Sequence, residues 1–455
     1  SAWLMAMKAY AVTVVFGVIV AGTDVSSPSP APGDGLELTL LPAAVMPGGR
    51  CLDGAMAGYY FRQGVPDTFV IQMHGGGACY DEESCKKRAK SDLGSSAGWT
   101  KYYPTTTKNL PVQTDCAINP FFCNATAVTI PYCTGDTHRG NNTAPSPLTW
   151  GLYFDGHANF VAIIEELVAK HGLGKASRVL LSGGSAGGVG TFYNVDWLAE
   201  RLPSATVKGA PNAGWFFPSA LKDDSPPAYP HPPSDFAHFS AGEHGNALNA
   251  SLSAFINKEL WKASGLFPPA CVAAQKPDEW WACDSVDVLY PYVKSPLYVI
   301  ENQFDTNQIF NQEGAPEHPA NASEADSLRR YVIMYGEAMR NSIAQVLANK
   351  SLIKKPQPDG IFSPSCFQHV VNDPVEVDGQ KCLLWVGDWC FEGNRLQQYH
   401  RLIESCPASA PAGLPCNSNT HACAFSLAPS PPGPGPAPGP TPTGTCAEQL
   451  KKDGC

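Results

Sequence analysis

The most constraining feature of this sequence is the segment RVLLSGGSAGG at residues 178–188, which contains the pattern G-x-S-x-G around Ser185. An apolar run typical of a buried strand precedes the pattern, and a helical repeat of apolar residues follows it and ends before Pro203. In a strand-turn-helix of this kind, small neighbours permit a tight turn that exposes the serine hydroxyl. The segment therefore predicts a nucleophile elbow; the alternative is a glycine-rich turn without a catalytic role.

Other apolar runs alternate with helical patterns along the chain. Strands are expected at residues 69–73, 127–130, 178–182 and 297–300, and helices at residues 160–168, directly after Ser185, and at residues 326–349. Alternating strands and helices predict an α/β fold with a mainly parallel sheet flanked by helices. Residues 218–291 are rich in Pro, His and Trp, and we interpret them as an insertion over the active site.

The cysteine and sequon patterns indicate an oxidising compartment. Sixteen cysteines without a single CxxC pair favour disulfides over zinc sites. Five N-x-S/T sequons supply the glycosylation candidates, which are Asn124, Asn141, Asn249, Asn321 and Asn349. Together these patterns predict a secreted, extracellular protein.

The two ends of the sequence differ in composition from its middle. A short apolar run at residues 9–20 follows Lys8, so we expect a signal peptide at residues 1–22, with an uncleaved anchor as the alternative. A disordered linker is expected at residues 23–35, the hydrolase domain at 36–427 and a Pro-rich linker at 428–445. Residues 446–455 form a short stub with Cys446 and Cys455. The stub is either the start of a wall-binding module or a tethered tail closed by one disulfide.

A second glycine-rich segment, MHGGGA at residues 73–78, ends the strand expected at residues 69–73. Glycines at this place let backbone N–H groups approach a substrate oxygen, as in the oxyanion loops of esterases. The expected oxyanion-hole donors are the N–H groups of Gly76, Gly77 and Ala186. The alternative is a structural turn.

A serine nucleophile of this type needs an acid and a histidine base later in the chain. Asp305 fits the acid because it lies just beyond the strand expected at residues 297–300, whereas Asp284 and Asp287 lie in what we interpret as a loop. His369 follows Cys366 in the segment SPSCFQH, a loop that we expect Cys366 to pin. The histidines downstream of the serine are His231, His238, His244, His318, His369, His400 and His421. Their spacing matches no metal motif such as HExxH, so no metal or organic cofactor is expected.

Six sequence blocks occur in one order: HGGGACYDEESC, NPFFCNATAVTIPYCTGDTHRG, LLSGGSAGGVGTFYNVDWLAERL, APNAGWFF, FDTNQ and SPSCFQH. Through these blocks, over roughly residues 50–400, the sequence resembles the pectin acetylesterase/Notum family. The resemblance implies an α/β-hydrolase fold with a triad at Ser185, Asp305 and His369. It also implies two local disulfides, Cys79 with Cys85 and Cys271 with Cys283.

The segments resemble different branches of this family. The segment after Ser185 is closer to the Notum branch, whose members remove a fatty acyl group from Wnt proteins. The glycines Gly75 to Gly77 are closer to the pectin acetylesterases, and Gly77 stands where Notum proteins carry a Trp. His74 replaces the acid that is usual in the family before these glycines.

These features predict a serine carboxylesterase that removes an O-acetyl group from pectin or another cell-wall polysaccharide. The first alternative is removal of a fatty acyl group from a protein or lipid, for which Trp215-Phe216-Phe217 and Trp280-Trp281 would line an apolar pocket unless they are core. The second is an inactive binding ectodomain. A net charge of -10 without a Lys/Arg-rich run argues against a nucleic-acid partner. We expect a monomer, associated with the cell wall through its C-terminal tail.

Overall fold

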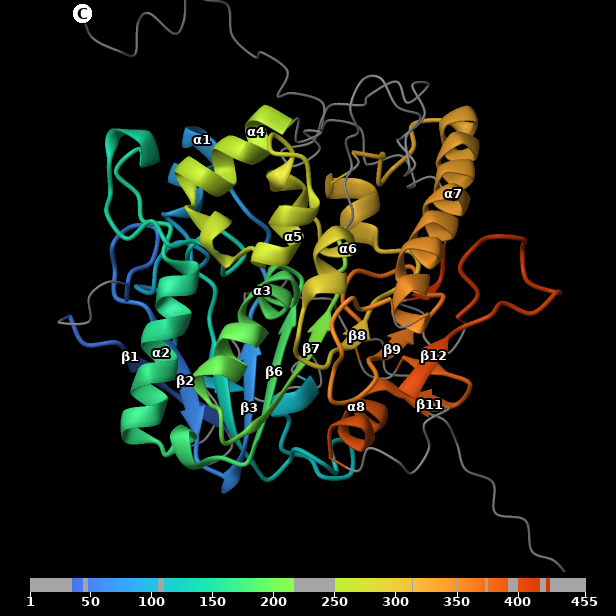
Figure 1. Ribbon diagram of the computed structural model, residues 1–455. Coiled ribbons are helices and arrows are strands. Elements are labelled where there is room, and N and C mark those ends of the chain that lie inside the picture. The colour runs from blue at the N-terminus through green and yellow to red at the C-terminus, as the bar shows by residue number, and fades with distance from the viewer. Residues whose placement is uncertain are drawn as a thin grey trace, which may run out of the picture.

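The computed structural model describes residues 35–43, 48–104, 110–216, 250–312, 314–348, 350–372, 375–391, 400–417 and 423–425. Ten strands of these ranges form one sheet in the order β12-β9-β8-β7-β6-β3-β5-β2-β1-β4 (Figure 1). Neighbouring strands from β12 to β5 are parallel, and β2, β1 and β4 extend the sheet in antiparallel fashion. The predicted, mainly parallel sheet is confirmed, and the antiparallel extension is an additional feature.

The strands of the sheet are β1 (Gly35–Leu40), β2 (Gly58–Arg62), β3 (Val65–Met73), β4 (Tyr102–Pro104), β5 (Ala125–Ile130), β6 (Arg178–Gly184), β7 (Thr206–Asn212), β8 (Tyr298–Ile300), β9 (Gly360–Ser363) and β12 (Arg401–Ile403). A small hairpin pairs β10 (Glu376–Val377) with β11 (Gln380–Lys381). The helices are α1 (Glu82–Arg88), α2 (Gly156–Lys170), α3 (Ala186–Arg201), α4 (Ala250–Phe255), α5 (Pro269–Ala274), α6 (Val286–Leu289), α7 (Ala322–Leu347) and α8 (Cys382–Phe391). Each strand and helix expected from the sequence overlaps one of these elements.

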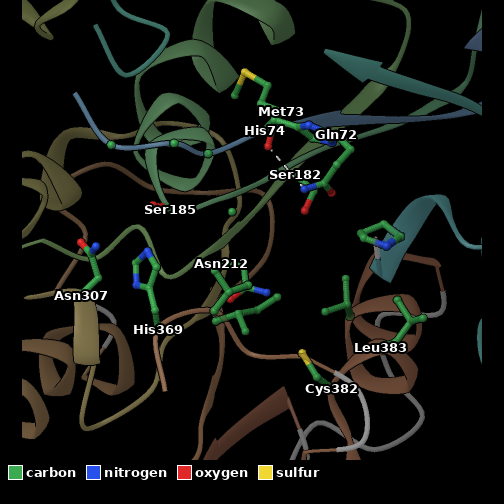
Figure 2. A pocket seen from close by; sticks show the side chains of 18 of the residues that line it. Gln72, Met73, His74, Ser182, Ser185, Asn212, Asn307, His369, Cys382 and Leu383 are labelled. Carbon is green, nitrogen blue, oxygen red and sulfur yellow. Dashed lines mark hydrogen bonds between the residues drawn. The ribbon is translucent and has the colours of Figure 1, made fainter. Parts of the chain in front are cut away.

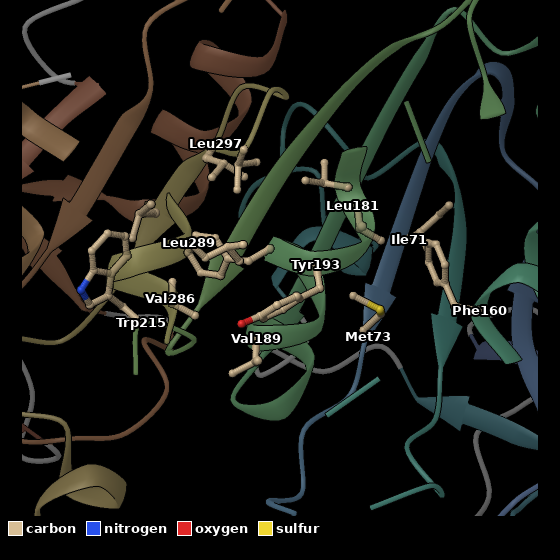
Figure 3. Packing of buried hydrophobic residues seen from close by; sticks show 14 of the residues in the cluster. Ile71, Met73, Phe160, Leu181, Val189, Tyr193, Trp215, Val286, Leu289 and Leu297 are labelled. Carbon is tan, nitrogen blue, oxygen red and sulfur yellow. The ribbon is translucent and has the colours of Figure 1, made fainter. Parts of the chain in front are cut away.

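Apolar side chains of the strands alternate between the two faces of the sheet, as strand geometry requires. In β3, Phe69 and Ile71 join the main core with α2, α3 and α7, whereas Val70 joins a second core with α8. Figure 3 shows part of the main core around Leu181 and Trp215. The sheet is therefore buried on both faces, which is typical of parallel strands in α/β proteins.

Part of the expected insertion forms a cap at one end of the sheet. We call residues 250–292 the cap; it contains α4, α5 and α6, which lie beyond the carboxyl ends of the parallel strands in Figure 1. Residues 218–249 of the insertion lie outside the described residues. The cap therefore occupies the end of the sheet at which active sites of open α/β folds form.

Six disulfides connect cysteines of the described ranges, and the two pairs implied by the family resemblance are among them. The pairs are Cys51–Cys133, Cys79–Cys85, Cys116–Cys123, Cys271–Cys283, Cys366–Cys423 and Cys406–Cys416. Within the same ranges Cys382 and Cys390 carry free thiols. The cysteines of the stub, the expected signal peptide and the Pro-rich linker lie outside the described residues.

Surface features relevant to secretion are only partly within the described ranges. Asn124, Asn141 and Asn321 are exposed, and Asn321 also caps α7 by accepting a hydrogen bond from the Glu324 N–H group. Asn249 and Asn349 lie outside the described residues. Among the helices that the structure describes, none has the length and apolar character needed to cross a bilayer.

Arg139, in the segment that follows β5, holds the cap against the rest of the fold. Its guanidinium forms an ion pair with Asp284 of the cap and lies over the rings of Tyr193 and Trp261, at 4.7 and 5.2 Å from their centroids. The Tyr193 hydroxyl, on α3, also lies 2.9 and 2.8 Å from the carbonyl oxygens of Cys283 and Asp284. The sequence predicts a loop at Asp284, and the structure gives this residue a role in holding the cap.

Arg139→Ala should destabilise the protein strongly, because it leaves the Asp284 carboxylate without its cation in a site where the two side chains are 6% and 17% exposed. Breaking a buried pair from one side typically costs about 3–5 kcal/mol. Urea unfolding of the purified variant measures the loss. Replacing both residues, Arg139→Met with Asp284→Leu, should recover part of it. A single variant that unfolds within about 0.5 kcal/mol of the wild type, as surface substitutions do, would contradict the proposed fastening role.

Candidate active site

Ser185 occupies a strained turn between β6 and α3. Its backbone has φ 57° and ψ −122°, a conformation that side-chain-bearing residues rarely adopt. Its N–H group donates to the Asn212 carbonyl on β7, at 2.9 Å. A Cβ atom on Gly187 would overlap the Met73 carbonyl group, so the turn requires glycine there. Strain of about 1–3 kcal/mol per residue is characteristic of functional turns. The close approach of the Met73 carbonyl group explains the glycine at position 187.

The glycine-rich loop after β3 lies directly against this turn. Strands β3 and β6 are parallel neighbours with Met73 paired to Gly183, so the segments that follow them are adjacent. A Cβ atom on Gly75 would lie 2.6 Å from the Cβ atom of Ser185. Gly76 and Gly77 have φ values of 147° and 70°, which favour glycine. The loop glycines and the first residue of α3, Ala186, thus lie on two adjoining segments.

His138 contacts the backbone at the start of the glycine-rich loop. No local sequence pattern reveals this role. Its Nε2 atom lies 2.7 Å from the backbone oxygen of His74, the residue that begins the loop. Burial lowers the pKa of His138 to about 4. The ring is therefore neutral near pH 7, and its single N–H donates to this carbonyl. Asn194 of α3 holds His138 in turn by donating to its carbonyl oxygen, at 3.0 Å.

Asp305 and His369 form a hydrogen-bonded pair. Both carboxylate oxygens of Asp305, a fully buried residue, lie 2.8 Å from His369 Nδ1. The Asp305 carboxylate also accepts hydrogen bonds from the backbone N–H groups of Asn307 and Gln308, at 2.8 and 3.1 Å. At the other side of the ring, His369 Nε2 has no hydrogen-bond partner among the described residues. This pattern is that of an imidazole oriented by a carboxylate, with one nitrogen left for proton transfer.

Three contacts fix the loop that carries His369. Asn302 donates to the His369 carbonyl oxygen, at 3.0 Å. The Asn212 side chain both donates to and accepts from the backbone of Val371, at 2.8 and 3.0 Å. The Cys366–Cys423 disulfide closes the loop on its other side, in agreement with the expected pinning by Cys366.

The other histidines considered from the sequence do not join this cluster. His400 pairs with Asp388 on α8, with 2.7 Å between His400 Nε2 and an Asp388 oxygen. His318 does not line the cavity described below. His231, His238, His244 and His421 lie outside the described residues. Within those residues, no group of three or more His, Cys, Asp or Glu side chains is arranged to hold a metal ion.

Ser185 and His369 line one cavity of about 460 Å³, together with the glycine-rich loop (Figure 2). The cavity continues along the face of the sheet towards Leu383 of α8. Two atoms near this continuation are buried and have no hydrogen-bond partner among the described residues: Gln72 Oε1 and His74 Nε2. Burial lowers the pKa of His74 to about 4, so this imidazole is neutral. The residues that line the cavity therefore include apolar side chains and two polar side chains, each with an atom that has no hydrogen-bond partner among the described residues.

The aromatic segments considered as pocket lining do not line this cavity where they are described. Trp215 is a fully buried core residue whose indole N–H donates to Ser342 of α7 at 2.7 Å. Trp280 packs against the core, and the Trp281 indole donates to a nearby carbonyl in the cap. Phe216 lies edge-on to the His369 ring, with 6.2 Å between centroids. Phe217 lies outside the described residues.

The sequence is similar to a known protein family and to several known proteins. The family model for Pectinacetylesterase matches residues 30–421. Pectin acetylesterase 11 of Arabidopsis thaliana is 28% identical over 393 residues, which cover 83% of this chain and 93% of that protein. The palmitoleoyl-protein carboxylesterase notum2 of Xenopus laevis is 27% identical over 329 residues, which cover 70% of this chain and 60% of that protein.

The same relationship holds in three dimensions. The crystal structure of the Wnt deacylase Notum from Drosophila has a TM-score of 0.64 and 26% identity, and the match covers 86% of this chain and all of that one. This similarity confirms the α/β-hydrolase-like fold. The matched part spans about 60% of the length of the Xenopus Notum proteins. Because the family model covers most of the sequence, the chain belongs to the pectinacetylesterase family.

Proposed function

We propose that this protein is a serine carboxylesterase in which Ser185 is the nucleophile, His369 the base and Asp305 the orienting acid. The observation that carries the proposal is the His369 ring, which is bonded through Nδ1 to a buried carboxylate, has no partner for Nε2 among the described residues, and lines the same cavity as Ser185. The strained Ser185 turn supports it, because strain at a serine between a strand and a helix is typical of a nucleophile elbow. Membership of a family that contains carboxylesterases supports it independently.

In the proposed reaction, His369 Nε2 takes the hydroxyl proton of Ser185 as the serine oxygen attacks the ester carbonyl carbon. Asp305 stabilises the imidazolium that forms. The tetrahedral intermediate then collapses, and the imidazolium gives its proton to the leaving alcohol. Water, deprotonated by His369, attacks the acyl-enzyme, and collapse of the second intermediate releases the acid and restores the Ser185 hydroxyl. This sequence needs no metal or organic cofactor.

The negative oxygen of each intermediate would be bound by the N–H groups of Gly76, Gly77 and Ala186. The first two belong to the loop against Ser185, and the third begins α3, where the helix dipole also favours negative charge. His138 would act through this loop by holding the His74 carbonyl. Loss of one oxyanion donor typically lowers kcat by about a hundredfold to a thousandfold.

For the substrate, we propose a short acyl group, such as acetyl, on a carbohydrate. The support lies in two polar atoms of residues that line the cavity: Gln72 Oε1 and His74 Nε2 are buried without a partner among the described residues, and the hydroxyl groups of a ligand that reached them would supply the missing hydrogen bonds. A long alkyl chain placed against the same atoms would leave them without hydrogen bonds. Each buried polar group left unpaired costs about 1–3 kcal/mol. The absence of the described tryptophans from the lining points the same way.

This substrate proposal predicts that kcat/KM for p-nitrophenyl acetate exceeds that for the palmitate ester, and that acetate is released from acetylated pectin or xylan. A series of p-nitrophenyl esters from acetyl to palmitoyl measures the preference at one leaving group. Gln72→Leu should weaken activity on the polysaccharide more than activity on p-nitrophenyl acetate, which has no hydroxyl groups to bind. Faster cleavage of the long chains without acetate release would instead favour the removal of fatty acyl groups.

We further propose that the enzyme is secreted and acts outside the cell. Six disulfides within the described residues favour an oxidising compartment, and three of the sequon asparagines are exposed there. Cell-wall association through the C-terminal Pro-rich segment and a monomeric state belong to the same proposal. Fractionation of cells that produce the full chain, with deglycosylation of the recovered protein, tests it.

A further inference from the structure

We propose that Glu301 is a positioning residue that stays protonated, donates a hydrogen bond to the Asp305 carboxylate and thereby lowers the basicity of His369. This inference rests on the proposed Ser185–His369–Asp305 triad. It assigns to Glu301 a role that the sequence pattern alone does not reveal, because Glu301 precedes Asp305 by four positions in an irregular segment and belongs to no motif.

Glu301 and Asp305 meet around the backbone of Trp215. Glu301 follows β8, and its Oε2 atom accepts a hydrogen bond from the Trp215 N–H group at 2.9 Å. The Trp215 carbonyl accepts from the Gln308 side-chain amide at 3.2 Å, and this same amide nitrogen lies 3.4 Å from Asp305 Oδ2. Residue Trp215 and the Gln308 amide thus tie the two carboxyl groups into one buried cluster, in which both acids are fully buried.

The charges around this cluster cannot stabilise two carboxylates. His369 lies on the Asp305 side and is bonded to Asp305 itself. Arg340 of α7 donates to the Gln303 side chain at 3.2 Å and lies over the Phe304 ring. Among the described residues, no salt bridge reaches Glu301. Two adjacent buried carboxyl groups with this environment cannot both ionise, so one of them keeps a proton.

The hydrogen bonds decide which acid keeps the proton. Asp305 accepts from two backbone N–H groups and from His369, all of which favour its ionised form. Among the described residues, Glu301 accepts from one backbone N–H group only, through Oε2. Burial, followed by the neighbouring Asp305 charge, raises the pKa of Glu301 well above its usual range. We therefore assign its proton to Oε1, which is buried without a hydrogen-bond partner among the described residues.

The consequence for His369 follows from the hydrogen bonds that the Asp305 carboxylate accepts. A carboxylate that accepts an additional hydrogen bond attracts the imidazolium less strongly, so His369 loses its proton at a lower pH than it would without Glu301. Because the base must be neutral to act, the acid limb of the kcat/KM profile moves down with it. The Glu301 proton also holds Asp305 in the orientation that His369 requires.

Two variants test this inference. Glu301→Gln keeps a donor for Asp305 and an acceptor for the Trp215 N–H group, so its pH profile should coincide with that of the wild type and kcat should change less than about threefold, the loss expected if one neutral hydrogen bond were weakened. Glu301→Leu removes both, and we expect the acid limb to move to higher pH by about one unit, with kcat lowered by about tenfold and little change in KM, because one charge-assisted bond is lost. The measurement is kcat/KM for p-nitrophenyl acetate across the pH range, with thermal unfolding as the folding control.

Infrared difference spectra supply a second measurement that does not depend on turnover. Burial raises the pKa of Asp155 to about 8, so its protonated carboxyl group also absorbs near pH 7. In Ser185→Ala, the carboxyl absorption near pH 7 should contain a further component that disappears when Glu301→Gln is added. Its absence overturns the proposal even if Glu301→Leu fails to fold. A shift of the Glu301→Gln acid limb to lower pH by about one unit would also overturn it, because that result means an ionised Glu301. If a folded Glu301→Leu protein has the same dependence of kcat/KM on pH as the wild type, Glu301 has no positioning role. If the proposed triad itself were wrong, Ser185→Ala would retain activity. The infrared measurement would still report whether Glu301 is protonated, so the two failures are distinguishable.

Discussion

Ser185→Ala is expected to lower kcat for p-nitrophenyl acetate by about a millionfold, the loss typical when the nucleophile of a catalytic triad is removed. The side chain lost is one hydroxyl group, and its Cβ atom, which Gly75 approaches closely, is retained. The strained turn is determined by the backbone bond to the Asn212 carbonyl and by the glycines around it, so the fold should persist. Residual turnover would come from background hydrolysis and from binding alone.

Ser182→Ala provides the matched control for this experiment. Ser182 lies three residues earlier on β6, and its hydroxyl donates to the Ala210 carbonyl of β7 at 2.8 Å. Its loss should cost about 1 kcal/mol of stability, as expected for one hydrogen bond, and should leave turnover within about tenfold of the wild type. Near-wild-type hydrolysis by Ser185→Ala would disprove its assignment as nucleophile and would leave the inactive binding ectodomain or another nucleophile to be examined.

Asp305→Asn is expected to lower kcat by about ten-thousandfold while preserving the structure. The single oxygen of the new amide is expected to face the backbone N–H groups of Asn307 and Gln308, which now bind the carboxylate. The amide NH₂ group then faces His369 Nδ1, which must accept instead of donate. The proton of the neutral ring moves to Nε2, and the nitrogen that should take the Ser185 proton is blocked. A pH series of kcat measures whether activity recovers at high pH.

Asp388→Asn controls for the loss of an aspartate-histidine pair in general. Asp388 and His400 form such a pair on the α8 side, at 2.7 Å, away from Ser185. The change should affect stability and leave turnover close to that of the wild type. If Asp388→Asn abolished activity and Asp305→Asn did not, the base would have to be sought at His400 and the proposed triad would be wrong.

Local patterns predict the central elements well because their signals are contained in short segments. The strand, turn and helix around Ser185 are visible in one run of residues, and α2 and α7 have clear helical repeats. Helix α8 is harder, because CLLWVGDWCF is apolar on nearly every side and periodicity does not distinguish a buried helix from a buried strand. The antiparallel strands β1, β2 and β4 are short edge elements whose pairing depends on partners far along the chain.

The residues of the site likewise form two groups, those that the sequence predicts and those that it does not. Ser185, Asp305 and His369 are named by motifs and by family resemblance, whereas the residues that hold them are not. His138 lies 64 positions from the His74 carbonyl that it binds, and Asn212 lies 159 positions from Val371. Such contacts exist only because the parallel sheet brings distant loops to one edge. For Trp215 the sequence leaves pocket lining and core as alternatives, and the structure places it in the core.

The Cys366–Cys423 disulfide has a consequence for the order in which the protein becomes active. It ties the loop of His369 to a cysteine 57 positions later, beyond β12. Synthesis reaches Ser185 and its elbow long before it reaches Cys423. A nascent or still reduced chain therefore carries the nucleophile without the covalent tether of its base. Full esterase activity should accordingly appear late in biogenesis, after release of this segment from the ribosome and oxidation of the thiol pair.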